Sequence, residues 1–320
     1  MSKKIIIDTD PGVDDAMAIQ FALNSPELEV LGLTTVFGNV KLELCTENAL
    51  RLLDLGGRND IPVAAGAATP LQGPFPGGAA FVHGEDGQGN TNKPKSNSKV
   101  LEIPASEFLA NTIKKYPNEI TICTLGPLTN LALLIQNSPE IIDLVKEIII
   151  MGGNIFIPGN ITPAAEANIW ADPLAADLVL GQSWPITLIG LDATHQTILP
   201  NKLVDSIRDR SNSALNQHVT KAYQFYQKFY NANYEFAGTY IHDSAVIAYS
   251  IRPNLFGKKA FPIKVETADV VSKGKTWPLE GEPDFENRPQ LAAWRDRPAV
   301  DVVLEVDSEG FLELLLSRLV

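Results

Sequence analysis

The segment IIIDTDPGVDDA, residues 5–16, sets the fold of this chain. Its run of β-branched residues predicts a strand that is buried on both faces. Pro11 and Gly12 predict a turn, and the two acids that follow are typical of the first turn of a helix. The segment therefore predicts a strand, a tight turn and a helix in immediate succession, which is the opening unit of an α/β protein.

Short apolar runs rich in β-branched residues recur and alternate with longer segments of helical period. They lie at residues 29–36, 62–65, 120–124, 148–151, 186–191 and 302–306. This alternation predicts one large α/β domain over residues 1–320, with a mainly parallel central sheet flanked by helices in a Rossmann-like arrangement. Because ligands of such sheets bind beyond the carboxyl ends of the strands, we expect the functional residues just after the apolar runs.

Two segments interrupt this alternation. Residues 72–98 contain FVHGEDGQGN and are too long and polar for a simple connection, so they predict a loop over a site. Residues 220–240 are rich in aromatic side chains and have helical spacing, with Tyr223, Tyr226 and Tyr230 on one face, before they end in loop-like residues. Since the segment that follows leads directly to His242, we expect active-site loops near residues 72–98 and 220–242.

The overall composition limits the possible functions. The 320 residues are 45% hydrophobic, which is enough to build a substantial core. A formal net charge of −12 without basic runs argues against binding to nucleic acid or anionic membranes and favours a neutral small-molecule substrate. Cys45 and Cys123 predict two buried free thiols in a reducing compartment. With no apolar run long enough for a signal sequence or a membrane span, we expect a cytoplasmic protein.

Four carboxylates crowd the first strand end and turn. Asp8 and Asp10 lie at the end of the predicted strand, Asp14 and Asp15 open the helix, and no Arg or Lys occurs between residues 5 and 40. Capping of a helix explains one acid but not four. Because like charges so close repel, the segment predicts a bound cation, and donors that are all oxygen favour Ca²⁺, with Mg²⁺ as the next candidate.

The DTD motif after an apolar strand also resembles the start of haloacid-dehalogenase-like phosphatases, in which the first Asp is the nucleophile. That alternative requires a later Lys and an acidic pair to complete a phosphate site. The later acids of this chain occur instead with amides and a His. A phosphatase therefore stays the principal enzymatic alternative at this point.

Further motifs favour a different family. The blocks DTDPGVDDA, TTVFGNV, LGPLTN, MGGN, GNITPAAEANIWADP, GLDATHQ and HDSA follow one another across about the first 250 residues. In this order they resemble the inosine-uridine-preferring nucleoside hydrolase family, in its His-containing group. The resemblance implies the nucleoside hydrolase fold, a homodimer or homotetramer, and hydrolysis of the N-glycosidic bond of ribonucleosides such as inosine or uridine to free base and ribose.

The resemblance also implies roles for individual residues. The calcium ligands are expected to be Asp10, Asp15, the carbonyl of Leu125, and Asp243. The residues expected to bind the sugar are Asp14, Asn39, Asn160, Glu166 and Asn168, with the Met151 backbone and Asn154 beside them. Such carboxylates and amides suit a ribose, which offers a cis-diol and a primary hydroxyl. Asp8 is expected to orient the strand end rather than to bind directly.

A mechanism follows from the chemistry of the bond. Its cleavage builds positive charge on the ribose, so anionic surroundings stabilise the transition state. We expect a calcium-bound water that is deprotonated by Asp10, without a covalent enzyme intermediate. His242, with a pKa expected near neutrality, would assist the departing base. His83 is expected near the base or the ribose 5′ end, and Tyr226 and Tyr230 are expected to stack on the base or hydrogen-bond it.

Some expectations concern residues outside this set. His195 is expected to be structural and His218 to lie on a helix surface. Ala167 stands where family members often carry Phe, whereas Phe37 stands where they often carry a small residue, so we hypothesise that aromatic bulk has moved across the nucleoside pocket. A nucleoside-binding protein without turnover is the non-enzymatic alternative, but the intact set of Asp10, Asp15, Asp243 and His242 argues against it.

Overall fold

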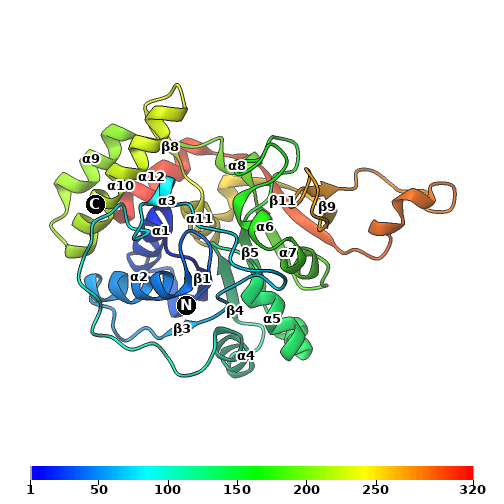
Figure 1. Cartoon of the computed structure of the whole chain (residues 1–320), viewed down its shortest axis with the longest axis horizontal. Helices are drawn as coiled ribbons and strands as arrows, with labels where there is room; N and C mark the ends of the chain where they lie inside the picture. The colour runs from blue at the N-terminus through cyan, green and yellow to red at the C-terminus, as the bar shows by residue number, and fades with distance from the viewer. Residues whose placement is uncertain (1, 320) are drawn as a thin grey trace.

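A nine-stranded sheet forms the centre of the protein in the computed structural model, which describes residues 2–319 (Figure 1). The strand order is β10-β9-β11-β6-β5-β4-β1-β2-β3. The strands of this sheet are β1 (Lys3–Thr9), β2 (Leu28–Thr35), β3 (Val63–Ala65), β4 (Ile120–Thr124), β5 (Glu147–Met151), β6 (Ile186–Ile189), β9 (Phe256–Val265), β10 (Thr276–Pro278) and β11 (Ala299–Val306). A separate antiparallel pair consists of β7 (Ile198–Pro200) and β8 (Gly238–Tyr240).

The sheet is mostly parallel, which confirms the predicted fold class. All pairs from β3 to β11 along the strand order are parallel, whereas β9 pairs antiparallel with both β11 and β10. The sequence did not predict β9 because its residues, FGKKAFPIKV, mix charged and apolar side chains without regular alternation. The middle of the strand is exposed in the structure. The predicted strand at 186–191 runs too far, since β6 ends at Ile189 and Leu191 already begins a helix.

Helices cover both faces of the sheet. The longer helices are α1 (Val13–Leu23), α2 (Leu42–Leu55), α4 (Ala105–Lys115), α5 (Thr129–Asn137), α7 (Pro173–Leu180), α9 (Asn201–Arg210), α10 (Ala214–Asn233), α11 (Asp243–Ile251) and α12 (Ser308–Leu319). The shorter ones are α3 (Ala80–His83), α6 (Ala167–Ala171) and α8 (Leu191–Thr194), with 3₁₀ turns η1 (Pro139–Leu144), η2 (Pro253–Leu255) and η3 (Pro289–Trp294).

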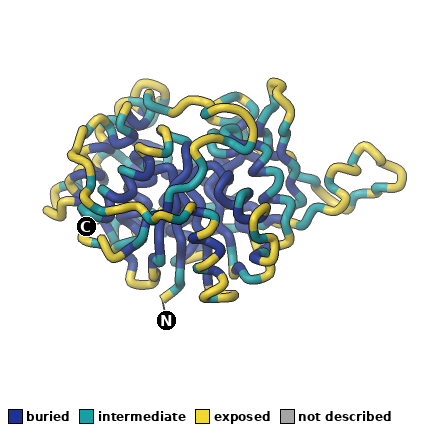
Figure 2. Tube along the Cα trace, turned by 60° about the horizontal axis from the view of Figure 1, so that its bottom comes forward, coloured by how far each residue is buried: buried dark blue, intermediate teal, exposed yellow. Residues whose placement is uncertain are grey.

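Two hydrophobic clusters lie on the two sides of the sheet. Ile5 and Ile7 of β1 pack into the cluster that contains residues of α1, α10 and α11, whereas Ile6 packs into the cluster that contains residues of α4, α5 and α7. Neighbouring side chains of a strand point to opposite faces, so both faces of β1 are buried. Figure 2 shows this buried centre inside an exposed periphery. The apolar run that opens the chain therefore forms the middle of the core.

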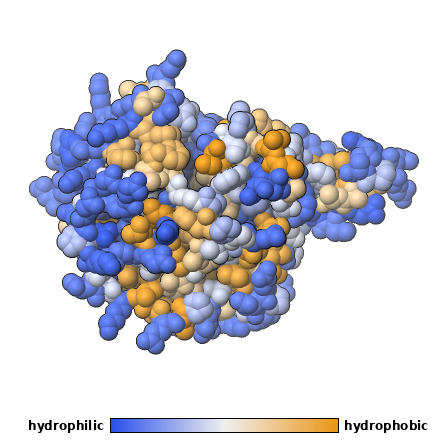
Figure 3. Space-filling model, viewed as in Figure 1, coloured by the Kyte–Doolittle hydropathy of each residue, from blue (hydrophilic) through white to orange (hydrophobic). Residues whose placement is uncertain are grey.

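Features outside the core bear on the function. Cys45 and Cys123 are buried free thiols, as predicted. Among the helices of residues 2–319, none combines the length and apolar character that crossing a bilayer requires. An arm between β10 and β11 projects from the body (Figure 1), and its tip is hydrophilic in Figure 3. The same view shows apolar side chains in separate groups among hydrophilic ones.

Candidate active site

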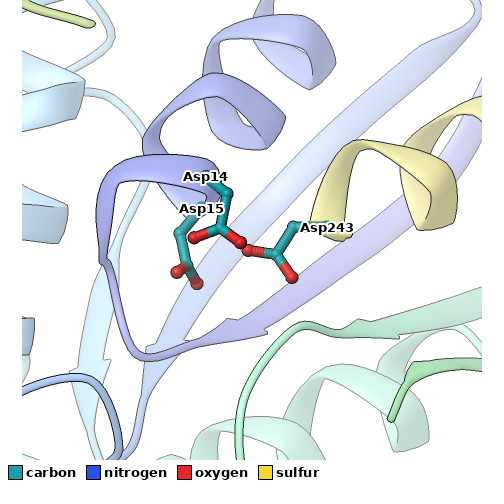
Figure 4. A group of neighbouring side chains, drawn as sticks. All are labelled: Asp14, Asp15 and Asp243. Atoms are coloured by element: carbon teal, nitrogen blue, oxygen red, sulfur yellow. The ribbon is translucent and has the colours of Figure 1, made fainter. Parts of the chain in front are cut away.

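Three carboxylates converge where two helices begin. Asp14 and Asp15 lie in the first turn of α1, Asp243 is the first residue of α11, and their oxygens lie within 4.8 Å of one another (Figure 4). The Asp15 carboxylate accepts hydrogen bonds from Gly12 N at 2.9 Å and from Asn39 Nδ2 at 3.1 Å. The turn that follows β1 thus places two acids against a third that is distant in sequence.

Asp10 follows β1 and lies beside this cluster. Its Oδ2 accepts a hydrogen bond from Asn39 N at 2.7 Å, while its buried Oδ1 has no hydrogen-bond partner within residues 2–319. A Cβ atom at Gly38 or at Gly126 would overlap the Asp10 carboxylate, so glycine is needed for the backbone to approach it this closely. The buried Asp14 Oδ1 likewise makes no hydrogen bond in the described part of the chain.

The carboxylates of the cluster resist ionisation on their own. Burial raises the pKa of both Asp14 and Asp15 to about 6, and for Asp15 the charge of Asp14 is the next cause. Burial and the neighbouring acids raise the pKa of Asp10 and of Asp243 well above the usual range. A cation among these oxygens offsets the repulsion between the carboxylates, and the unpaired oxygens become its ligands. The donor set, which is entirely oxygen, fits a hard divalent ion, so the cluster is able to hold a metal.

A cavity lies beside the cluster, and its lining combines polar with aromatic side chains, as is typical of small-molecule sites. The predicted residues that line it are Asp14, Asn39, His83, Leu125, Met151, Asn160, Glu166, Asn168, Tyr226, Tyr230, His242 and Asp243. Residues that the sequence did not single out line it too, namely Ala79, Phe81, Val82, Ile161, Phe229 and Tyr234. Their apolar character at irregular spacing offered no signal, since it is also typical of core packing.

The polar wall of the cavity is built around Glu166 and Asn168. Glu166 precedes α6, and its carboxylate accepts hydrogen bonds from Gly153 N at 2.9 Å and Asn168 N at 2.8 Å. Burial nevertheless raises the pKa of this carboxyl. Asn168 Nδ2 donates to the Leu125 carbonyl at 2.7 Å, which fixes an oxygen that was predicted as a metal ligand. Hydrogen bonds therefore join the residues after β4 and β5 to the start of α6, and together they form one wall of the cavity.

Two predicted residues of this wall hold it together. Asn160 lines the cavity, and its Oδ1 accepts a hydrogen bond from Ala167 N at 3.0 Å. Asn154 does not line the cavity. Its Nδ2 donates to the carbonyls of Ile157 and Ala164 at 2.9 and 3.0 Å, and its Oδ1 accepts from Glu166 N. These bonds use the amide of Asn154 to close the loop 155–165, so the structure places it behind the wall that Glu166 and Asn168 form.

The other wall is a chain of hydrogen bonds from α10 to α11. Tyr226 OH donates to Asp14 Oδ2 at 3.2 Å and lies 3.3 Å from Tyr230 OH. Tyr230 OH in turn lies 3.1 Å from His242 Nε2, while Thr194 Oγ1 lies 2.9 Å from His242 Nδ1. The helix that was predicted from its tyrosine spacing thus connects the acidic cluster to His242.

The pKa of His242 differs from the expectation. Burial, followed by the neighbouring His195, lowers it to about 3 rather than leaving it near neutrality. His242 is therefore a neutral imidazole at physiological pH. His83 lines the same cavity, and burial lowers its pKa to about 4. Its Nδ1 accepts a hydrogen bond from Val13 N at 3.1 Å, which leaves the proton of the neutral ring on Nε2.

Of the two remaining histidines, one departs from the sequence interpretation. His195 stacks on Tyr240, with ring centroids 4.0 Å apart, and also lines the cavity. His218 does not lie on a helix surface but is only 2% exposed, and its Nε2 lies 3.0 Å from Gln88 Oε1. The face of α10 that carries His218 is covered by the loop after α3, which the helical period alone does not show.

Comparison with known proteins decides the family. The model of the inosine-uridine preferring nucleoside hydrolases matches residues 5–313. The chain belongs to this family. It is 43% identical to the probable uridine nucleosidase 2 of Arabidopsis thaliana over 318 residues, 99% of this chain and 97% of that protein. It is 35% identical to the inosine-uridine preferring nucleoside hydrolase of Crithidia fasciculata over 322 residues, 100% of this chain and 98% of that protein.

Solved structures agree with this membership. A plant nucleoside hydrolase superimposes with a TM-score of 0.92 at 40% identity, covering 100% of this chain and 99% of its own. A purine-preferring ribonucleoside hydrolase from Gardnerella vaginalis gives a TM-score of 0.89 at 33% identity, covering 99% and 98%. The protein is thus a nucleoside hydrolase, an enzyme that hydrolyses ribonucleosides, and the phosphatase alternative is wrong.

The structure also tests the idea that aromatic bulk moved within this nucleoside hydrolase. Ala167 does line the cavity. Phe37, however, is not among the lining residues and packs edge-on against Phe75, with ring centroids 6.0 Å apart. The buried ring of Phe37 therefore supports the loop 72–98 instead of replacing bulk opposite Ala167.

Proposed function

We propose that this nucleoside hydrolase cleaves the N-glycosidic bond of ribonucleosides, uridine among them, and releases free base and ribose. The observation that carries the proposal is that one cavity joins an acidic cluster to the Tyr230–His242 pair. Uridine is included because curated relatives along nearly the whole chain are named uridine nucleosidases. Inosine is the second candidate, since the family model and the Crithidia relative carry both nucleosides in their names.

The acidic side suits the developing charge of the reaction. As the bond to the base breaks, the ribose ring becomes positively charged, and the buried carboxylates of Asp14, Asp15 and Asp243 stabilise that charge. Asp10, whose carboxyl pKa burial raises well above the usual range, accepts the proton of the attacking water. The closely packed backbone at Gly38 and Gly126 keeps this carboxylate in one position. No covalent bond between enzyme and sugar is needed.

We further propose that the resident cation is calcium, with magnesium as the alternative. The carboxylates of Asp10, Asp15 and Asp243 and the Leu125 carbonyl would hold it, and Asp14 lies close enough to share in the site. When bound, the ion makes water more acidic and offers positive charge to the ribose diol. The two buried, unpaired carboxylate oxygens of Asp10 and Asp14 support such an ion.

The base side handles the departing nucleobase. Neutral His242 and the Tyr230 hydroxyl share one hydrogen bond, and Thr194 orients the imidazole from its other nitrogen. In the tautomer with a proton on Nε2, His242 donates to the Tyr230 oxygen, and the Tyr230 hydrogen turns from the Tyr226 oxygen, 3.3 Å away, to the departing base when a nucleoside is bound. The pair thus donates a hydrogen bond that stabilises the negative charge developing on the departing base.

The cellular setting is proposed from composition and family. We propose a cytoplasmic homodimer or homotetramer that serves nucleoside salvage or catabolism. Two buried free thiols suit a reducing compartment. Size-exclusion chromatography with light scattering would determine the number of subunits.

The direct test is base release from a panel of inosine, adenosine, guanosine, uridine and cytidine, with and without chelator. We expect release of uracil from uridine, its loss with chelator, its return with added calcium, and at least a hundredfold loss in Asp10→Asn, about the lower limit for a general base. A melting temperature equal to that of the wild type would show that Asp10→Asn is folded. No release from any nucleoside, with binding retained, would overturn the proposal.

A further inference from the structure

The loop after α3 turns one amide side chain into the protein interior. Asp86 organises this loop, because its Oδ1 accepts hydrogen bonds from Gln88 N at 2.7 Å and Asn90 N at 2.8 Å. Gly89 has a φ of +65°, and a Cβ there would lie 2.5 Å from the Ala222 carbonyl, so the loop backbone rests directly on α10. Gln88 is consequently fully buried, 0% exposed, between the loop and the start of α1.

Gln88 binds both carbonyls of the turn that carries the acidic cluster. Its Nε2 donates to Pro11 O at 3.1 Å and to Gly12 O at 2.7 Å. Each peptide unit is planar, so holding its carbonyl also holds the N–H of the next residue. The peptide unit of the Pro11 carbonyl contains the N–H of Gly12, which donates to Asp15 Oδ2. The peptide unit of the Gly12 carbonyl contains the N–H of Val13, which donates to His83 Nδ1. One side chain therefore fixes the N–H donors to one acid of the cluster, Asp15, and to one histidine of the cavity, His83.

His218 determines which way the Gln88 amide faces. Since the Gln88 nitrogen is used by the turn carbonyls, its Oε1 must accept, and His218 donates from Nε2 at 3.0 Å. A flip of the amide would place its oxygen against two carbonyl oxygens and its nitrogen against the His218 donor. A neutral His218 with its proton on Nε2 is the partner that excludes this flip. Asn48 Nδ2 adds a second donor to Pro11 O at 3.1 Å.

We propose that Gln88 and His218 are a positioning pair for the cation-binding acids of this enzyme. They set the orientation of the two peptide units of the Pro11–Gly12 turn, and thereby the position of Asp15 and of His83. The inference rests on the proposed function, because it takes Asp15 to be a ligand of the proposed calcium ion. Neither residue lines the cavity, so the pair acts only through the turn.

The test compares cation binding with stability. Calorimetric titration of chelator-treated protein with calcium alone measures Kd for wild type, Gln88→Leu, His218→Phe and the double variant. The matched control is Gln20→Leu, because Gln20 Nε2 donates to Asn216 Oδ1 at 3.1 Å and forms another buried amide bond between α1 and α10, away from the turn. Thermal unfolding of the same samples, without calcium, reports the structural cost of each change.

We expect Gln88→Leu to weaken calcium binding by about 10- to 100-fold, as for other groups that orient metal ligands. Gln20→Leu should lower the melting temperature comparably and leave the calcium Kd unchanged. His218→Phe should weaken binding less, and adding it to Gln88→Leu should weaken binding no further, because both act through one amide. Uridine hydrolysis by Gln88→Leu should recover as calcium is raised.

The inference is overturned if Gln88→Leu loses stability but keeps the wild-type calcium Kd, or if the two single losses add in the double variant. It is also overturned if the wild-type chain binds no calcium. Since the titration contains no nucleoside, a chain that binds calcium through this pair but releases no base would contradict the proposed function while leaving the positioning pair in place.

Discussion

Replacing Tyr230 with Phe removes one hydroxyl from the base side of the cavity and leaves the ring. That hydroxyl lies 3.1 Å from His242 Nε2 and 3.3 Å from Tyr226 OH. Burial raises the pKa of Tyr230 well above its usual value, so the group holds its proton and is able to donate it in a hydrogen bond. Because one positioned hydrogen-bond donor to a developing anion contributes about 10²–10³-fold and His242 stays, we expect kcat to fall about 100-fold, or about 2.7 kcal/mol of barrier.

The leaving group provides the decisive assay. Uridine needs a proton or a hydrogen bond on the departing base, whereas p-nitrophenyl riboside releases a phenolate that is stable as an anion. We therefore expect Tyr230→Phe to lose about 100-fold with uridine and to hydrolyse p-nitrophenyl riboside nearly as well as the wild type. Both rates are followed by absorbance on the same enzyme preparation, at saturating calcium.

Tyr223→Phe is the matched control for this experiment. Tyr223 lies on the same helix, is buried, and hydrogen-bonds Thr239, but does not line the cavity. Each substitution removes buried hydroxyl bonding that stabilises the fold by roughly 1 kcal/mol, so the two variants should have similar melting temperatures. Equal losses of Tyr230→Phe on both substrates, or a uridine loss in Tyr223→Phe as large as in Tyr230→Phe, would refute the assignment of Tyr230 to the leaving base.

Three further predictions concern the cluster and the loop. Gly38→Ala should displace the Asp10 carboxylate, lowering uridine turnover at least tenfold while costing about 1–3 kcal/mol of stability; retained turnover would contradict the close packing. Calcium at 100 times its Kd should stabilise the protein by about 2.7 kcal/mol in thermal unfolding, and Asp243→Ala should abolish this shift. Burial lowers the pKa of His218 from 6.5 to about 4, so the unfolded chain takes up a proton first and the free energy of unfolding falls as pH drops below about 6.5. His218→Phe lacks this group, so its loss of stability relative to the wild type should shrink by up to about 2 kcal/mol between pH 7.5 and 5. An unchanged difference in stability would argue against a buried neutral His218.

Local sequence patterns were sufficient for much of the fold. The apolar runs predicted seven strands of the central sheet, and the turn at Pro11–Gly12 was correctly placed between β1 and α1. Strand β9 escaped because three of its successive residues, Lys258 to Ala260, are exposed and carry no alternation. These residues precede the part of β9 that pairs with β10, so they lie at an open edge, and an edge that faces solvent need not be apolar and resembles a loop in sequence.

The candidate site was accessible because its residues follow strand ends or begin helices, where spacing and residue type carry the signal. Asp14 and Asp15 were evident from one turn of sequence, and family motifs added Asp243. The motifs predicted that Asn154 lies beside the sugar, but its amide donates hydrogen bonds to two carbonyls of its own loop instead of lining the cavity. Which of two polar groups faces a cavity depends on the hydrogen bonds around it, and these are made by residues distant in sequence.

The sequence by itself determined seven strands of the central sheet, the acids that gather at the end of β1, and the chemistry that those acids favour. Only the tertiary structure decided that His218 is buried against Gln88 and that His242 is neutral with a pKa of about 3. Periodicity and residue type are local properties of the chain. Burial, the partner of a hydrogen bond and the field at a titratable group arise only when segments such as α1, α10 and the loop after α3 pack together.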